Sequence, residues 1–376
     1  MTKPLEGYRI IELAGIGPGP YAGQLLADMG AEIILINRPG PMANIPAISN
    51  RGKKTMVLDL RKPEGVAIVL DLIKSADVLF EGLRPGVTER LGLGPDACQA
   101  VNPKLIYGRM TGWGQSGPWA KTAGHDINYI SITGALGAMG APGTPPMPPL
   151  NLVGDYGGGT MFLVTGILAA LLKAEKTGKG EVVDAAMIDG VSSLMGMFHS
   201  MAGIGQWNPE RGTNLLDGAK PYYRCYETSD GKYMAVGCIE PQFFAIMLDK
   251  LGITPEAYGG QNDKSQFEAQ CALLETTFAH KSRDEWAEIF YGTDACVSPI
   301  LTYDEAADHP QNKARGGLKK QGNFTHPRTA PVFMSQIDDE PFHIPGGNDD
   351  ADAVLKALGY DDAKIESLRA DGITPA

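Results

Sequence analysis

The sequence has few cysteines, no surplus of positive charge and no long apolar run. Its five cysteines form no C-x-x-C pair, a pattern typical of a reducing compartment and unlike a thiolate zinc site. The formal net charge of −11 argues against a nucleic-acid-binding surface, although local basic residues can still hold a small anion. No apolar run reaches the roughly 18 residues that span a bilayer, and the first residues lack the apolar core of a signal peptide. We therefore expect a cytoplasmic protein with no metal site, no membrane insertion and no nucleic-acid partner.

At 376 residues the chain exceeds the usual limit for one hydrophobic core, so we expect two domains. The clearest change along the chain is a hairpin signal, in which strand-like residues 222–228 and 232–239 flank S-D-G. We predict a large domain over residues 1–202, a linker over 203–220, a small domain over 221–315, a second linker over 316–329, and a return to the large domain over 330–376.

Strand-like and helix-like segments alternate through the large domain. The segments that are typical of buried strands are 8–13, 31–36, 55–60, 77–80, 105–109 and 181–186. Repeated β-α alternation predicts an α/β fold, in which helices cover a parallel sheet and ligands bind at the carboxyl ends of the strands.

A glycine-rich turn, A-G-I-G-P-G-P, follows the first predicted strand and precedes a helix, which suits phosphate binding. Its spacing is not G-x-G-x-x-G, and Arg38 stands where an acidic residue would hold the ribose of NAD. Arginine favours a phosphate group, as in NADP or a CoA-like ligand, or else it is a solvated loop residue. Arg61, Arg84 and Arg90 also follow predicted strands, so these arginines are either separate surface charges or one cationic rim for a polyanion.

Two titratable residues, His125 and Asp155, each stand before a segment that is typical of a helix. Together they could form a pair of proton-transfer groups, because an imidazole titrates near neutrality and a carboxylate can take up or release a proton. The alternatives are a structural histidine and a helix-capping aspartate. Three glycines, Gly157 to Gly159, would leave backbone N–H groups open to an oxyanion at the helix start. Glu240, before Pro241, is either a third partner or a carboxylate stabilised by a helix dipole.

A further predicted helix carries four methionines, which either fill the core or line an apolar substrate wall: Met187, Met195, Met197 and Met201. From the residues alone we predict a soluble α/β enzyme with an anionic ligand and acid–base chemistry.

Nearly the whole chain resembles the α-methylacyl-CoA racemases of the family III CoA-transferase superfamily. The resemblance rests on E-L-A-G-I-G-P-G-P, D-V-L-F-E-G-L-R-P-G, R-M-T-G-W-G-Q-S-G-P, A-G-H-D-I-N-Y, G-D-Y-G-G-G and I-E-P-Q-F. It implies a Rossmann-like large domain, a smaller α+β domain and an interlocked homodimer. It also implies a cofactor-independent isomerase that inverts the α-carbon of 2-methylacyl-CoA thioesters by 1,1-proton transfer through an enolate.

By this resemblance His125, paired with Glu240, serves one face of the α-carbon, and Asp155 serves the other. The implied CoA site comprises Arg38, Leu58, Asp59, Leu60, Arg61, Gly82, Leu83, Arg84, Arg90, Gly124, Asp126, Ile127, Asn128 and Tyr129. The methionine-bearing helix is similar to the family's apolar surface for the acyl chain. Two alternatives are a family III CoA transferase with Asp155 as nucleophile and a CoA-binding protein without catalysis.

Overall fold

The computed structural model describes residues 3–41, 47–334 and 342–375, and the chain divides into two compact units. The first unit comprises Met1–Ala135, Pro149–Met195 and Gly316–Ala376, and the second comprises Leu136–Pro148 and Gly196–Arg315. Residues 136–148 fall within the range that the sequence assigned to the large domain. They group with the second unit because the Arg211 guanidinium donates to the carbonyls of Gly137 and Thr144. Of the expected return segment 330–376, residues 335–341 and 376 lie outside the described part.

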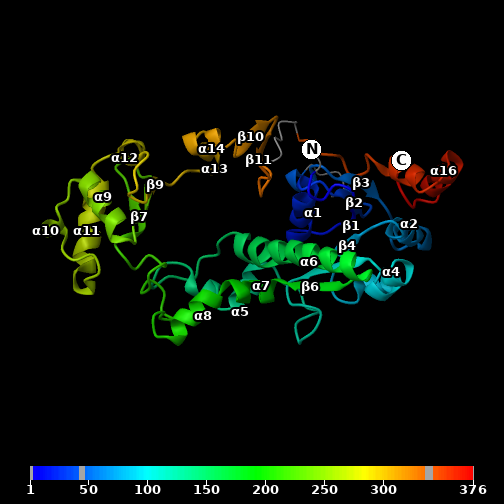
Figure 1. The fold of residues 1–376 in the computed structure, drawn as a ribbon, viewed down its shortest axis with the longest axis horizontal. Helices are drawn as coiled ribbons and strands as arrows, with labels where there is room; N and C mark the ends of the chain where they lie inside the picture. The colour runs from blue at the N-terminus through cyan, green and yellow to red at the C-terminus, as the bar shows by residue number, and fades with distance from the viewer. Residues whose placement is uncertain (1–2, 42–46, 335–341, 376) are drawn as a thin grey trace. The chain divides into compact units, whose positions relative to one another are not determined.

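The first unit is built on a six-stranded sheet in which every neighbouring pair of strands is parallel. Its strands are β1 (Arg9–Leu13), β2 (Glu32–Asn37), β3 (Lys54–Val57), β4 (Val78–Glu81), β5 (Ile106–Thr111) and β6 (Val182–Ala186). They lie in the order β3-β2-β1-β4-β5-β6 (Figure 1). The α/β fold with a parallel sheet is thus confirmed. The strand order reverses direction between β1 and β4, which is where doubly wound sheets bind ligands.

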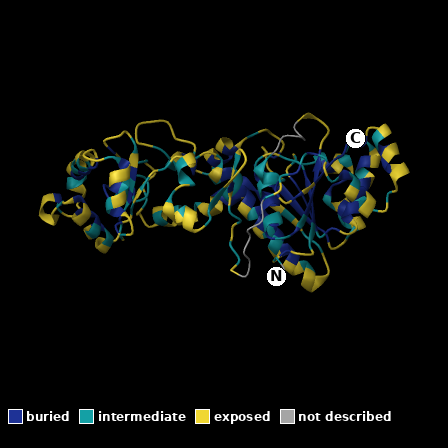
Figure 2. Cartoon of the chain, turned by 90° about the horizontal axis from the view of Figure 1, so that it is seen from above, coloured by how far each residue is buried: buried dark blue, intermediate teal, exposed yellow. Residues whose placement is uncertain are grey.

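Neighbouring residues of a strand pack into separate hydrophobic cores on the two faces of the sheet. Ile10 belongs to the core under α1 (Pro18–Asp28) and α6 (Met161–Thr177), whereas Ile11 belongs to the core under α2 (Pro63–Ile73). This alternation is the two-residue period of a strand with both faces buried. Helices α15 (Ala351–Ala357) and α16 (Asp362–Ala370) also pack on the second of these cores, so the C-terminal segment covers the sheet. Figure 2 shows the strands of this sheet coloured as buried.

Proline sets the start of several helices, because its fixed φ and missing N–H suit the first helical turn. Pro18, Pro63 and Pro241 hold this position in α1, α2 and α9 (Pro241–Leu251). The other short elements of the first unit are α3 (Val87–Leu91), α4 (Pro95–Val101), α5 (Asp126–Ile132), α7 (Met187–Leu194), β10 (Leu318–Gln321) and β11 (Phe324–Pro327).

One helical stretch, Leu152–Thr177, is long and apolar enough by length and composition to cross a membrane. Its N-terminal part is a π-helix, η4 (Leu152–Thr160), and the remainder is α6. Helix α6 packs on β5 and β6, and core helices of this kind meet the same length and composition criteria.

The second unit has its own antiparallel sheet and core. Strands β7 (Tyr223–Glu227) and β8 (Tyr233–Gly237) form the hairpin predicted around S-D-G, and β9 (Val297–Pro299) pairs with β8. Their inner face packs on α9, α11 (Phe267–Phe278) and α12 (Arg283–Phe290) around Tyr226, Met234 and Trp286. The unit also contains α8 (Gly196–Gly203), α10 (Pro255–Tyr258), α13 (Tyr303–Ala306) and α14 (Pro310–Ala314).

A buried ion pair joins β1 to the residue that precedes β3. The Lys53 Nζ is 2.6 Å from the Glu12 Oε2, and both side chains are almost fully enclosed. We predict that Lys53→Met lowers the free energy of unfolding by about 3–5 kcal/mol, because it leaves a carboxylate buried without its partner. Denaturant unfolding measures this loss. The matched control is Lys54→Met, since Lys54 pairs with Glu32 at the surface and such pairs contribute about 0–1 kcal/mol. Equal losses in the two variants would contradict the prediction.

Candidate active site

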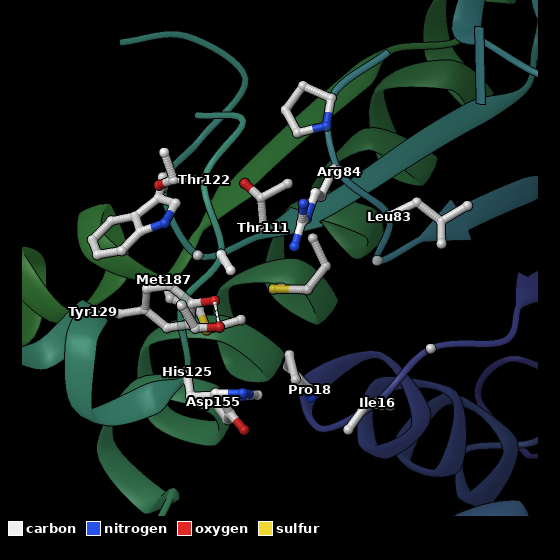
Figure 3. A pocket seen from close by; sticks show the side chains of 18 of the residues that line it. Ile16, Pro18, Leu83, Arg84, Thr111, Thr122, His125, Tyr129, Asp155 and Met187 are labelled. Atoms are coloured by element: carbon white, nitrogen blue, oxygen red, sulfur yellow. Dashed lines mark hydrogen bonds between the residues drawn. The ribbon is translucent and has the colours of Figure 1, made fainter. Parts of the chain in front are cut away.

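A cavity of about 380 Å³ opens in the first unit at the carboxyl edge of β1, β4 and β5. His125 and Asp155 both line it, and Figure 3 shows their side chains near one another in the same cavity. The rest of its wall comes from the ends of β1, β2, β4 and β5, from the loops that follow them and from three helices: Gly15, Ile16, Pro18, Arg38, Gly82–Pro85, Met110–Trp113, Ala120, Thr122–Gly124, Tyr129 and Met187. The two residues singled out as proton-transfer groups therefore share one enclosed space.

His125 is held at the start of α5 by local hydrogen bonding and by a tightly packed neighbour. Its extended backbone caps the helix, and its N–H donates to the Asn128 Oδ1 over 3.0 Å. Gly124 is required before it, because a Cβ there would lie 2.7 Å from the Tyr129 ring and 2.9 Å from the Trp113 ring. The Tyr129 hydroxyl donates to the Gly124 carbonyl. These contacts fix the backbone from which the imidazole projects.

Asp155 lies in the first turn of η4 and is not its N-cap, so the alternative that it caps a helix is wrong. The helix begins earlier because Asn151 is the N-cap and the first turns have π geometry. Two of the three glycines after Asp155 are tightly packed: Gly158 and Gly159 are buried, and a Cβ on Gly158 would overlap Val191 of α7, whereas Gly157 is half-buried. These glycines let η4 pack closely on α7, and this replaces the predicted row of open N–H donors.

The protonated form of Asp155 is favoured by its surroundings. Burial raises the pKa of the Asp155 carboxyl, and the nearby Asp126 charge raises this pKa further. The Asn151 amide, which donates to the Asp155 Oδ2 over 3.2 Å, and the His125 imidazole both act in the opposite direction. A carboxyl that keeps its proton to higher pH than usual is suited to giving a proton as well as taking one.

The glycine-rich turn after β1 contacts Asp155. Gly17 has a φ of +72°, and a Cβ on it would lie 2.7 Å from the Asp155 Oδ2. A side chain here would therefore be strained and would collide with the carboxylate. The sequence predicted phosphate binding at this turn, whereas in the structure Gly15, Ile16 and Pro18 form the cavity wall beside Asp155.

A second cavity, of about 390 Å³, adjoins the first at the ends of β1, β2 and β3. Arg38 and Leu83 line both cavities. The remaining wall is mostly apolar: Leu13, Ala14, Ile36, Pro39, Leu58, Asp59, Leu60, Arg61, Val87 and Leu91. The Arg61 guanidinium makes two 2.8 Å hydrogen bonds to the Asp59 carboxylate, and these lower the pKa of Asp59 to about 2. The charge of Arg61 is therefore largely balanced, whereas Arg38 is exposed between the two spaces.

The structure brings most of the sequence-predicted ligand residues to these two cavities. The residues placed in a wall are Arg38, Leu58, Asp59, Leu60, Arg61, Gly82, Leu83, Arg84, Gly124, Tyr129 and Met187. Arg90 is exposed on α3 and lines neither cavity. Ile127 is 44% exposed, and Asn128 borders a separate open depression with Trp113 and Trp119. Asp126 is buried, and its side chain is turned away from both cavities toward the Asp155 backbone.

The prediction that one helix carries all four methionines is wrong, because the helix is interrupted at Met195. Helix α7 ends at Leu194 and α8 begins at Gly196. Met187 lines the first cavity, whereas Met197 is 52% exposed and lies with Met201 in the second unit. Glu240 is the exposed N-cap of α9, also in the second unit.

Several wall residues were missed in the sequence, among them Ile16, Met110, Trp113 and Thr122. Met110 is the penultimate residue of β5 and Trp113 follows this strand, so the rule that ligands lie at carboxyl strand ends could have found both. In the residues that the structure describes, no group of three or more His, Cys, Asp or Glu side chains has an arrangement that could hold a metal ion.

The fold and the cavities define an α/β protein with a cavity at the switch point of a doubly wound parallel sheet, lined by a histidine and an aspartate. The chain belongs to CoA-transferase family III, whose model matches residues 5–348. It is 39% identical over 371 residues to the alpha-methylacyl-CoA racemase of Homo sapiens, covering 98% of this chain and 97% of that protein. The protein of the same name from Mus musculus is 41% identical over 373 residues, with the same coverage.

Other relatives have transferase names. The acetyl-CoA:oxalate CoA-transferase of Acetobacter aceti is 30% identical over 365 residues, covering 91% of this chain and 92% of that protein. The crystal structure of a CAIB/BAIF family protein from Brucella suis superposes with a TM-score of 0.79 at 28% identity, covering 95% of this chain and all of the other. The family thus includes both kinds of named activity on one fold.

We predict that Gly124→Ala destabilises the site, because its Cβ would press on the Tyr129 and Trp113 rings. Overpacking of this kind lowers the free energy of unfolding by about 1–3 kcal/mol. Thermal or denaturant unfolding measures the loss. The control is Gly19→Ala in α1, where an added Cβ would meet nothing within 4 Å. A Gly124→Ala variant as stable as the Gly19→Ala variant would contradict the packing argument.

Proposed function

We propose that the protein is an isomerase that inverts the α-carbon of 2-methylacyl-CoA thioesters. The observation that carries the proposal is the placement of His125 and Asp155 in one cavity at the switch point of the sheet. The similarity to two alpha-methylacyl-CoA racemases over nearly the whole chain supports it.

The chemistry requires two proton-transfer groups and an acidic carbon. A thioester acidifies the hydrogen on its α-carbon, so one group removes this proton and an enolate forms. The other group then gives a proton to the opposite face and inverts the centre. His125 and Asp155 supply these groups, and the raised pKa of Asp155 lets it act as the donor in one direction and the acceptor in the other. The reaction neither consumes nor produces protons, and it needs no redox cofactor.

The two adjoining cavities suit the two ends of an acyl-CoA. We place the nucleotide end in the largely apolar second cavity, with its phosphates near Arg38, and the thioester in the first cavity. Leu83 and Arg38, which line both, then contact the connecting part of the ligand. The role of Glu240 beside His125, the homodimer and the cytoplasmic location rest on the resemblance and remain proposals.

A second candidate is a CoA transferase in which Asp155 attacks the thioester as a nucleophile. The transferase names among the relatives favour it. It differs from the racemase in needing an acceptor acid, and this difference makes the two separable by experiment.

We predict that the protein exchanges the α-hydrogen of a 2-methylacyl-CoA thioester in deuterated water with no acceptor acid present. Proton NMR or mass spectrometry measures the exchange, and chiral analysis measures the inversion. His125→Ala and Asp155→Ala should each slow inversion by about 10²–10⁴-fold, the usual contribution of a general acid or base. A requirement for an acceptor acid would favour the transferase. Tight acyl-CoA binding without exchange at any pH would indicate a binding protein.

We predict that Arg38→Ala weakens CoA binding more than Arg61→Ala does. Loss of a charged hydrogen bond to phosphate should reduce affinity by about tenfold or more for Arg38. The effect at Arg61 should be smaller, because this guanidinium is already bound to Asp59. Calorimetric titration with CoA measures both affinities. Equal losses, or an unchanged affinity in Arg38→Ala, would count against this placement of the ligand.

A further inference from the structure

Asp126 is a buried carboxylate that contacts the backbone of a proposed catalytic residue. It is the first residue of α5 and is 7% exposed. Its Oδ2 accepts the Asp155 N–H over 2.7 Å, and this bond joins α5 to η4. Its Oδ1 is buried with no hydrogen-bond partner in the described structure. Burying a carboxylate in such a place costs free energy, so we expect Asp126 to have a role that offsets this cost.

The packing around Asp126 holds this carboxylate against η4. A Cβ on Gly154 would overlap the Asp126 Oδ2 and would also press on Ile130, so only glycine fits beside Asp155. Because the Asp126 side chain lines neither cavity, it is not placed to contact a ligand there. Its contact is with the protein chain at the point from which the Asp155 side chain projects.

The charge of Asp126 also acts on Asp155. It raises the pKa of the Asp155 carboxyl, in the same direction as burial. The other groups facing Asp155 are the Asn151 amide and the His125 imidazole, which act in the opposite direction, and the Tyr129 hydroxyl on α5. Burial, and after it the Asp155 charge, raises the pKa of Tyr129, and Arg84 opposes this rise. On the side of α1, Tyr21 packs on Tyr156 with ring centroids 4.7 Å apart. Asp126 is therefore the negative charge that favours protonated Asp155.

We propose that Asp126 is a positioning residue, which holds the backbone of Asp155 and through its charge sets how firmly Asp155 keeps a proton. This inference rests on the proposed function and departs from the CoA-binding role that the resemblance implied for Asp126. Inversion in both directions needs each of the two groups to give and to take a proton, so their proton affinities must be close. The Asp126 charge brings a buried carboxyl toward this condition without contacting the substrate.

Two variants separate the charge of Asp126 from its hydrogen bond. Asp126→Asn keeps an oxygen that can accept the Asp155 N–H and removes the charge, whereas Asp126→Ala removes both. We expect the acid limb of the kcat/KM profile of Asp126→Asn to move to lower pH by about one unit, as for loss of a nearby like charge. It should move equally in both directions of inversion, because the equilibrium between the epimers fixes the ratio of the two kcat/KM values. KM should stay within about twofold, and Asp126→Ala should lose a further roughly tenfold in kcat.

The matched control is Asp350→Asn. Asp350 likewise accepts a backbone N–H, that of Thr55, over 2.8 Å, but it caps α15 away from both cavities. This control should leave the acid limb and kcat unchanged. The inference would be overturned if the acid limb of Asp126→Asn stayed at the wild-type pH. A raised Kd for CoA in that variant without a pH shift would indicate instead that Asp126 binds the ligand.

A measurement that needs no turnover keeps this inference separate from the proposed function. Carboxyl ¹³C NMR of aspartate-labelled protein, with the Asp155 signal assigned by Asp155→Asn, follows the titration of Asp155 directly. We expect a lower midpoint in Asp126→Asn than in wild type and in Asp350→Asn. An unshifted midpoint would reject the inference even if the protein is a racemase, whereas a shifted midpoint without α-hydrogen exchange would reject only the reaction.

Discussion

The structure of the site depends on a constraint of the parallel sheet. All six strands end at one edge, and the connections that follow β1 and β4 leave in opposite directions at their shared border. The space between these connections cannot be filled by a helix from either side, so it is available to a ligand. The turn after β1, the loop after β4 and the end of β5 supply its walls. His125 and Asp155 belong to helical segments that reach this edge. The sheet therefore sets where their side chains lie relative to the cavity.

Close backbone packing then determines which residues can stand near the carboxylate. Gly17 and Gly154 leave room for the side chains of Asp155 and Asp126, and Gly158 lets η4 lie directly on α7. Each of these positions excludes a Cβ for a steric reason that is local to the site. The glycine-rich appearance of G-D-Y-G-G-G therefore reflects tight contact between helices and not flexibility. Rigid packing of this kind holds a proton-transfer group in place without help from the substrate.

Much of the fold could be predicted because each strand of the sheet is a short apolar run and several helices begin with proline. The meeting of Arg38 and Arg84 at one edge also followed, since parallel strands end together. The start of η4 could not be predicted, because a π-helix has neither the period nor the capping signals of an α-helix. The burial of Asp126 depends on a contact with η4, a segment distant in the sequence, and local patterns do not contain this information.

The wall that Arg38 and Leu83 share between the two cavities has a consequence for selectivity. In the proposed placement of the acyl-CoA, affinity gained at the nucleotide end can hold the reacting carbon in position even when the acyl group itself makes few contacts. The protein then recognises the CoA part, which all acyl-CoA substrates share. Such an arrangement tolerates different acyl groups. Evolution could also alter the chemistry at the imidazole and the carboxylate without weakening the binding of the CoA part.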